Sequence, residues 1–138
     1  MGRIMAIDYG LKRTGLAVTD TMQIIANGLD TVDTSALLHY LNQYCRNETV
    51  DAFVIGVPLD LQDKPAQIHG EVLKFIEKLK KAFPGKAIHE VDERFSSKMA
   101  EQTIRQSGLK KKKRRDKGLI DKVSATIILQ EFLETYKS

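Results

Sequence analysis

Carboxylates stand at three places in this sequence where they can take part in chemistry. Asp8 directly follows an apolar run, the pair Asp92-Glu93 ends a second strand-like run, and Asp121 lies in a C-terminal stretch of helical pattern. An ionised carboxylate at the end of a buried strand is costly unless an opposite charge compensates it. A bound divalent cation or a basic side chain that folds back supplies such a charge.

The ligand types available favour a hard cation rather than zinc. His39, His69 and His89 are scattered and match no zinc-binding spacing, and Cys45 is the sole cysteine of the sequence. Converging carboxylates without His or Cys suit Mg²⁺ or Mn²⁺, which prefer oxygen ligands. Two such cations roughly 4 Å apart activate a water and stabilise the leaving oxygen of a phosphodiester. These residue types therefore favour metal-dependent hydrolysis of a nucleic-acid backbone.

Each acidic position also has a structural interpretation. Asp8 can be a turn residue with a structural partner, and Asp92-Glu93-Arg94 can be a solvated strand end with a local ion pair. Asp121 can be a helix-start charge that the macrodipole favours. That explanation accounts for the place of Asp121 along the helix but not for the side of the helix on which it lies. Asp121 shares a stripe with Ala125 and Ile128, and this stripe should face the sheet.

Basic residues stand beside the acidic ones. Lys12 and Arg13 follow Asp8, and Arg94 follows the acidic pair, so we expect these three cations to meet phosphates near a cleaved bond. The formal net charge of +4 is itself only mildly basic. A solvated loop that aids solubility is the alternative for the run of cations before the final helix, but we expect this run to hold a polyanion. That run consists of Lys110, Lys111, Lys112, Lys113, Arg114 and Arg115.

The apolar pattern predicts the elements that position these residues. Period-two and β-branched runs predict strands, and apolar residues at helical spacing predict helices. The expected order is three meandering strands followed by helix, strand, helix, strand and helices, which implies a mixed sheet with helices on its faces. In such sheets functional sites gather at the carboxyl ends of the strands. The expected strands are 4–7, 16–18, 23–31, 52–57 and 87–93, and the expected helices are 37–45, 68–79, 96–108 and 118–136.

Length and composition limit the classes of protein. We expect the 138 residues to form one domain, residues 1–138. No apolar stretch approaches the length of a membrane span, and Asp8 interrupts the only candidate for a signal region. With the lone Cys45, this predicts a cytoplasmic protein without a membrane partner. No long exposed apolar helix suggests a dimer interface, so we expect a monomer and keep a dimer as the alternative.

Four stretches of the chain resemble the YqgF family, the ribonuclease-H-like proteins described as Holliday-junction resolvases or pre-16S ribosomal RNA nucleases. Together the four are highly specific, and they come in the family's order over nearly the whole chain. The loop after Pro58 departs from the family because it lacks the usual glycine. The matching stretches are Ile7-Asp8-Tyr9-Gly10-Leu11-Lys12-Arg13-Thr14-Gly15-Leu16-Ala17, Gly56-Val57-Pro58-Leu59, Asp92-Glu93-Arg94-Phe95-Ser96 and Ile120-Asp121-Lys122-Val123-Ser124-Ala125 through Leu129-Gln130.

The resemblance implies an α/β, ribonuclease-H-like fold, with a mixed five-stranded sheet (a three-strand antiparallel meander plus two parallel strands) flanked by helices. It also implies an acidic site of Asp8, the Asp92-Glu93 pair and Asp121, working with Mg²⁺ or Mn²⁺. Asp8, Glu93 and Asp121 are the expected catalytic residues, and Asp92 is a further candidate ligand. Glu93 is preferred over Asp92 because it shares a strand face with Val91.

Three functions remain as hypotheses. The first is a metal-dependent endonuclease that matures the 5′ end of pre-16S ribosomal RNA, which makes structured RNA the favoured partner. The second is a resolvase acting on branched DNA, where symmetric cutting of two strands demands a dimer. The third is a non-catalytic nucleic-acid-binding module, whose binding falls steeply with salt but needs no divalent metal.

Overall fold

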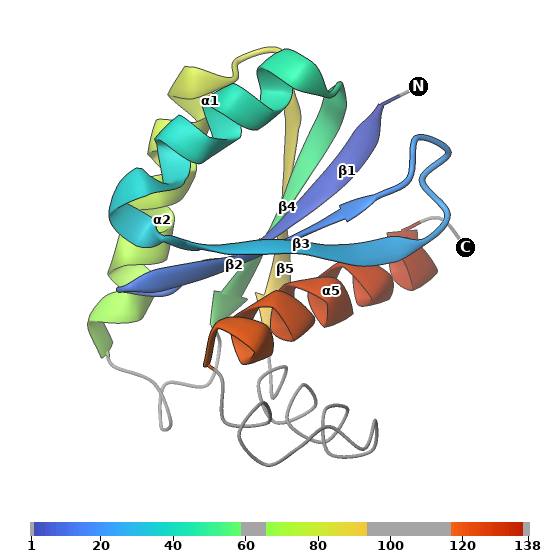
Figure 1. The fold of residues 1–138 in the computed structure, drawn as a ribbon. Coiled ribbons are helices and arrows are strands. Elements are labelled where there is room, and N and C mark those ends of the chain that lie inside the picture. The colour runs from blue at the N-terminus through green and yellow to red at the C-terminus, as the bar shows by residue number, and fades with distance from the viewer. Residues whose placement is uncertain (1, 59–65, 94–116, 137–138) are drawn as a thin grey trace.

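The computed structural model describes residues 2–58, 66–93 and 117–136, which form a twisted sheet between two layers of helix (Figure 1). Both expected layers of helix are present, although the predicted helix at 96–108 and the cationic run at 110–115 lie outside the described residues. In chain order the described elements are β1 (Arg3–Asp8), β2 (Arg13–Thr19), β3 (Ala26–Asp33), a 3-10 turn η1 (Thr34–Ala36), α1 (Leu37–Asn47), β4 (Val50–Pro58), α2 (Ala66–Ala82), β5 (Ala87–Glu93) and α5 (Lys117–Tyr136).

The five strands lie in the order β3-β2-β1-β4-β5. β1 pairs antiparallel with β2, and β2 pairs antiparallel with β3, while β4 runs parallel to both β1 and β5. This confirms the predicted meander of three strands followed by two parallel strands. Because β1, β4 and β5 run in one direction, their carboxyl ends meet at the same edge of the sheet, which we call the C-terminal edge.

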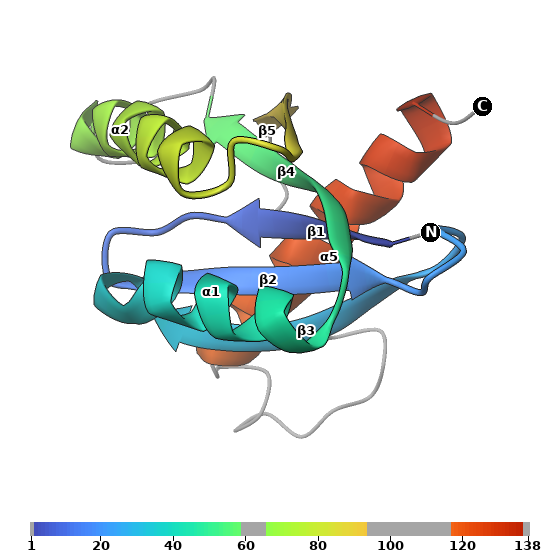
Figure 2. The same cartoon turned by 90° about the horizontal axis from the view of Figure 1, so that it is seen from above.

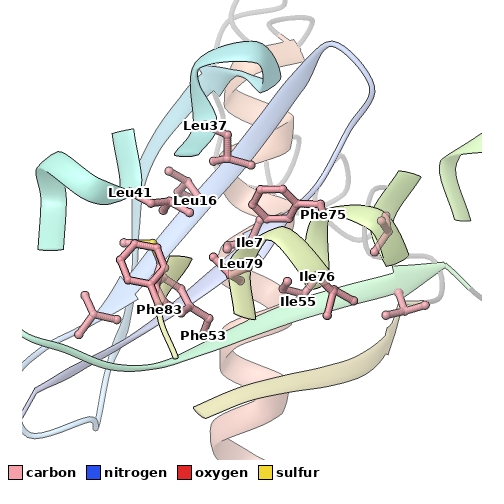
Figure 3. Packing of buried hydrophobic residues seen from close by; sticks show 14 of the residues in the cluster. Ile7, Leu16, Leu37, Leu41, Phe53, Ile55, Phe75, Ile76, Leu79 and Phe83 are labelled. Carbon is pink, nitrogen blue, oxygen red and sulfur yellow. The ribbon is translucent and has the colours of Figure 1, made fainter. Parts of the chain in front are cut away.

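The two faces of the sheet carry different cores, and the helices α1 and α2 lie on the opposite face from α5 (Figure 2). On one face, Met5 and Ile7 of β1 pack with residues of α1 and α2 in the larger cluster, part of which is drawn in Figure 3. On the other face, Ile4 and Ala6 pack against α5. The strand β1 is therefore buried on both faces, as its uninterrupted apolar run predicts.

The third strand begins and ends later than predicted, at Ala26–Asp33 instead of 23–31. The reason lies in the preceding turn, where Asp20 accepts hydrogen bonds from the backbone N–H groups of Met22, Ile24 and Ile25. Those residues are thereby committed to the turn rather than to the strand. The exposed positions of Met22, Ile24 and Ile25 follow from the same turn.

The final helix α5 crosses β1, β2 and β3 on the face opposite α1 and α2 (Figures 1 and 2). Its predicted stripe is buried against the sheet, with Ala125, Ile128 and Phe132 inside the second core. None of the helices in the described part of the chain is long and apolar enough to cross a membrane.

Candidate functional site

Asp8 is the last residue of β1 and lies at the C-terminal edge of the sheet. Strand alternation puts it on the same face as Ile4 and Ala6, which is the face that α5 covers. Only 8% of Asp8 is exposed, which is unusual for a carboxylate. Its partner across the β1–β2 ladder is Gly15, which has no side chain on that face.

Gly15 brings the final helix close to Asp8. A β-carbon at Gly15 would overlap the backbone carbonyl oxygen of Asp121, so α5 rests directly on the backbone of β2 at this point. Paired residues of antiparallel strands have Cα atoms about 5 Å apart. Asp8 and Asp121, which are far apart in sequence, therefore occupy adjoining positions on either side of a single glycine.

Asp121 lies beyond the first turn of α5, which contains no acidic residue. The helix macrodipole therefore does not explain its position, because that effect is confined to the first turn. Instead, Asp121 Oδ2 accepts a hydrogen bond from Arg13 Nε at 3.1 Å, in an ion pair between β2 and α5. Arg13, one of the two cations expected to compensate Asp8, is thus paired with Asp121.

The third acidic position lies on the neighbouring part of the same edge. β5 ends at Glu93, and the register aligns Asp92 with Val57 and Glu93 with Pro58 at the end of β4. The backbone of the pair thus reaches the C-terminal edge, with β4 between it and β1. The side chains of Asp92 and Glu93 lie outside the described residues, as does Arg94, so the preference for Glu93 over Asp92 stays a prediction.

The residues that are described suit a hard divalent cation. Asp8 and Asp121 provide oxygen donors from two elements, and a buried carboxylate such as Asp8 favours a cationic neighbour. Among the described side chains no group of three His, Cys, Asp or Glu residues gathers as a metal site. A complete ligand set would therefore need the acidic pair at the end of β5.

Other titratable groups near the edge have structural roles. Tyr9 packs on Phe75 with ring centroids 5.0 Å apart, and burial raises the pKa of its phenol, so Tyr9 is neutral near pH 7. His89 packs against Phe132 at 5.0 Å, and His39 is exposed on α1. His89 thus has a packing position and His39 a surface position.

The turn that carries Lys12 and leads into β2 is held by Thr34, a residue distant in sequence. Thr34 donates its backbone N–H to Lys12 O at 2.9 Å and its hydroxyl to Gly10 O at 2.7 Å. The buried Thr14 hydroxyl then donates to Thr34 Oγ1 at 2.9 Å. No local pattern in the sequence marks this role, because Thr34 lies more than twenty residues from the turn.

Lys122 is a further basic residue at the site that was not predicted. A β-carbon at Gly28 would come within 2.8 Å of Lys122 Cγ, so the lysine stem lies along β3 where that strand has no side chain. Lys122 follows Asp121 directly in the chain, and this adjacency is the sequence feature that could have identified it as a candidate. Of these basic residues, Arg13 pairs with Asp121 and Lys122 follows it in the chain, while Lys12 is exposed in the turn before β2.

Residues 2–135 match the family model RuvX, described as a Holliday junction resolvase. Relatives named "Putative pre-16S rRNA nuclease" include one from Amoebophilus asiaticus, 53% identical over 99% of this chain and 97% of its own length. Another, from Bacteroides fragilis, is 50% identical over 98% of both chains.

A solved structure supports the fold. The chain resembles Thermus thermophilus RuvC in complex with a Holliday junction substrate, with a TM-score of 0.59 and 15% identity, over 97% of this chain and 96% of the other. At that identity the likeness establishes the fold alone, and it confirms the predicted ribonuclease-H-like sheet. The family match spans almost the whole sequence and agrees with the relatives of about 50% identity, so the chain belongs to the RuvX family.

Proposed function

We propose that this chain is a metal-dependent endonuclease that hydrolyses phosphodiester bonds in structured RNA, and that it acts in 5′-end processing of pre-16S ribosomal RNA. The observation that supports the proposal is that Asp8 and the backbone of Asp121 both adjoin Gly15 at the C-terminal edge of the sheet. The names of the relatives at about 50% identity favour ribosomal RNA as substrate. The reaction takes place within one domain in the cytoplasm.

In the proposed reaction, a water oxygen attacks phosphorus, the bond to the leaving oxygen breaks, and that oxygen takes up a proton. Asp8, Asp121 and the Asp92-Glu93 pair would hold Mg²⁺ or Mn²⁺. A divalent cation held there would activate the attacking water or stabilise the negative charge of the leaving oxygen, and a pair of cations would do both at once.

The chain's own residues then bind and orient the substrate. Arg13 pairs with Asp121, Lys122 follows Asp121 in the chain, and Lys12 is exposed in the turn before β2, so all three are candidates to bind phosphate oxygens. The backbone of the turn at Gly10 is fixed by Thr34, so Lys12 starts from a defined position. The predicted contacts of Arg94 and of the cations at 110–115 would add to this binding, and they remain proposals.

The decisive experiment is cleavage of a pre-16S ribosomal RNA precursor with Mg²⁺ by the wild type, Asp8→Asn and Asp121→Asn. Both substitutions keep side-chain size and remove the charge, so both variants should cleave at least a hundredfold more slowly. Glu77→Gln is the control, because Glu77 is an exposed acid on α2 and should leave cleavage unchanged. Cleavage by Asp8→Asn at the wild-type rate would refute the proposal.

A DNA resolvase is the second candidate, favoured by the description of the family model. Symmetric cutting of a four-way junction requires two active sites related by a two-fold axis. The same preparation should therefore be given a DNA junction and sedimented at the working concentration. Symmetric junction cleavage by a dimer, without RNA cleavage, would replace the RNA assignment but keep the acidic site.

A non-catalytic binding module makes a different prediction. Binding to RNA would then fall steeply with salt, persist in EDTA and survive Asp8→Asn, with no cleavage under any condition. Cleavage that stops in EDTA and returns with Mg²⁺ or Mn²⁺ would exclude this alternative.

A further inference from the structure

Arg13 forms an ion pair with the carboxylate of Asp121, which a divalent cation bound at the proposed site would also need as a ligand. The Nε to Oδ2 distance of the ion pair is 3.1 Å, and the side chains are 39% and 25% exposed. Both partners are thus partly withdrawn from water, which strengthens a charge-assisted hydrogen bond relative to an exposed one. Arg13 therefore contributes positive charge to Asp121 in the structure described.

Arg13 is held near Asp121 by its backbone. It is the first residue of β2 and pairs with Asp33 of β3. The turn before it is closed by the hydrogen bonds of Thr34 to Lys12 O and Gly10 O. The backbone of Arg13 is therefore anchored before its guanidinium meets the carboxylate, and the entropy lost in forming the ion pair is that of the two side chains.

Asp121 is held from the other side by helix packing. The backbone of α5 at Asp121 rests on Gly15, and one residue later the stem of Lys122 lies along Gly28. These two close approaches determine where the carboxylate stands relative to β2. Because both backbones are fixed by contacts outside the pair, the ion pair is preorganised.

We propose that Arg13 is a positioning residue whose guanidinium orients the carboxylate of Asp121. In the absence of nucleic acid, the positive charge of this guanidinium weakens the binding of a divalent cation to the same carboxylate. A unit positive charge about 5 Å from a divalent cation in water-like surroundings opposes its binding by roughly tenfold. A nucleic-acid phosphate offers the guanidinium a second anionic partner, so the opposition falls when substrate is bound. Metal binding and substrate binding would thus favour each other.

This inference rests on the proposed metal-dependent function, so its test measures metal rather than cleavage. Mn²⁺ is titrated into nucleic-acid-free protein, with free Mn²⁺ followed by electron paramagnetic resonance. Binding is counted only where Asp8→Asn abolishes it. The variants are Arg13→Gln, which removes the charge, and Arg13→Lys, which retains it.

Arg13→Gln should bind Mn²⁺ about tenfold more tightly than the wild type, whereas Arg13→Lys should stay within about threefold of it. Lys78→Gln is the control, since it removes an exposed cation of α2 that is remote from Asp121 and should leave Mn²⁺ affinity unchanged. Adding a non-cleavable RNA should tighten Mn²⁺ binding by the wild type more than by Arg13→Gln.

Equal or weaker Mn²⁺ binding by Arg13→Gln would overturn the inference and leave the metal site standing. No Mn²⁺ binding by either the wild type or Arg13→Gln would overturn the proposed metal dependence as well. Circular dichroism melting of each variant shows whether it is folded. If Arg13→Gln is unfolded, Arg13→Met provides the uncharged variant, and the same tenfold gain is required of it.

Discussion

Gly15 of β2 touches the backbone of Asp121 in α5 so closely that no side chain fits between them. The same glycine is the ladder partner of Asp8. One residue without a side chain therefore lets the backbone of Asp121 approach the strand position opposite Asp8. The helix that carries Asp121 could not take this position against a strand with a β-carbon at residue 15.

Gly15→Ala should destabilise the protein by about 1–3 kcal/mol, because the added methyl group meets backbone and not a flexible side chain. It should also reduce RNA cleavage strongly, since α5 must shift and take Asp121 with it. Urea unfolding and the cleavage assay measure the two effects. Gly70→Ala is the control, because Gly70 lies in α2 with no atom within 4 Å of a β-carbon, and it should stabilise by roughly 0.5–1 kcal/mol.

Thr34→Val should lower the free energy of unfolding by about 1–2 kcal/mol. The change removes the hydrogen bond to Gly10 O and leaves the buried Thr14 hydroxyl without its acceptor. It should also weaken RNA binding, because the turn that carries Lys12 loses one of its ties. Thr34→Ser retains the hydroxyl and should restore both properties, and a Ser variant as defective as Val would contradict this role.

Lys122→Gln should weaken RNA binding roughly equally for different sequences and reduce the salt slope of log K by about 1, as expected for loss of one phosphate contact. The measurement is fluorescence anisotropy at several salt concentrations. Lys78→Gln, on the exposed side of α2, is the matched control and should leave the slope unchanged. An unchanged slope for Lys122→Gln would show that its ammonium group does not meet the nucleic acid.

The free energy of unfolding should fall at acid pH because Asp20 becomes protonated. Hydrogen bonds from the backbone N–H groups of Ile25 and Ile24, with a smaller one from Met22, lower the pKa of Asp20 in the folded state below its usual value of 3.8. A lowered folded-state pKa stabilises the protein above the unfolded pKa, and this contribution is lost as the pH falls through the folded value.

Thermal melts between pH 7 and pH 2.5 should therefore show a steeper loss of stability below about pH 4 in the wild type than in Asp20→Asn. Asp20→Asn should leave RNA cleavage unchanged, because the turn follows Thr19, whose hydroxyl accepts a hydrogen bond from the backbone N–H of Ile4 near the start of β1, whereas Asp8 is the last residue of that strand. Parallel acid profiles for the two proteins would rule out the contribution of Asp20.

Local patterns in the sequence determined the order of elements, the mixed sheet and the acidic residues at the strand ends. Apolar periodicity reports which side of a strand or helix is buried, so β1, β4 and the stripe of α5 were predicted correctly. Strand direction then follows from connection lengths, which puts the ends of β1 and β5 at one edge. The third strand was misplaced because hydrogen bonds to one Asp side chain override a weak strand pattern.

Only the tertiary structure decided how these residues meet. Three contacts join residues that are distant in sequence. They are the close approach of Gly15 to Asp121, the ion pair of Arg13 with Asp121, and the hydrogen bond of Thr34 to the turn at Gly10. Such contacts depend on strand register and on where a helix settles across the sheet. Neither is encoded in the periodicity of any single segment, because register and helix position result from the packing of the whole core.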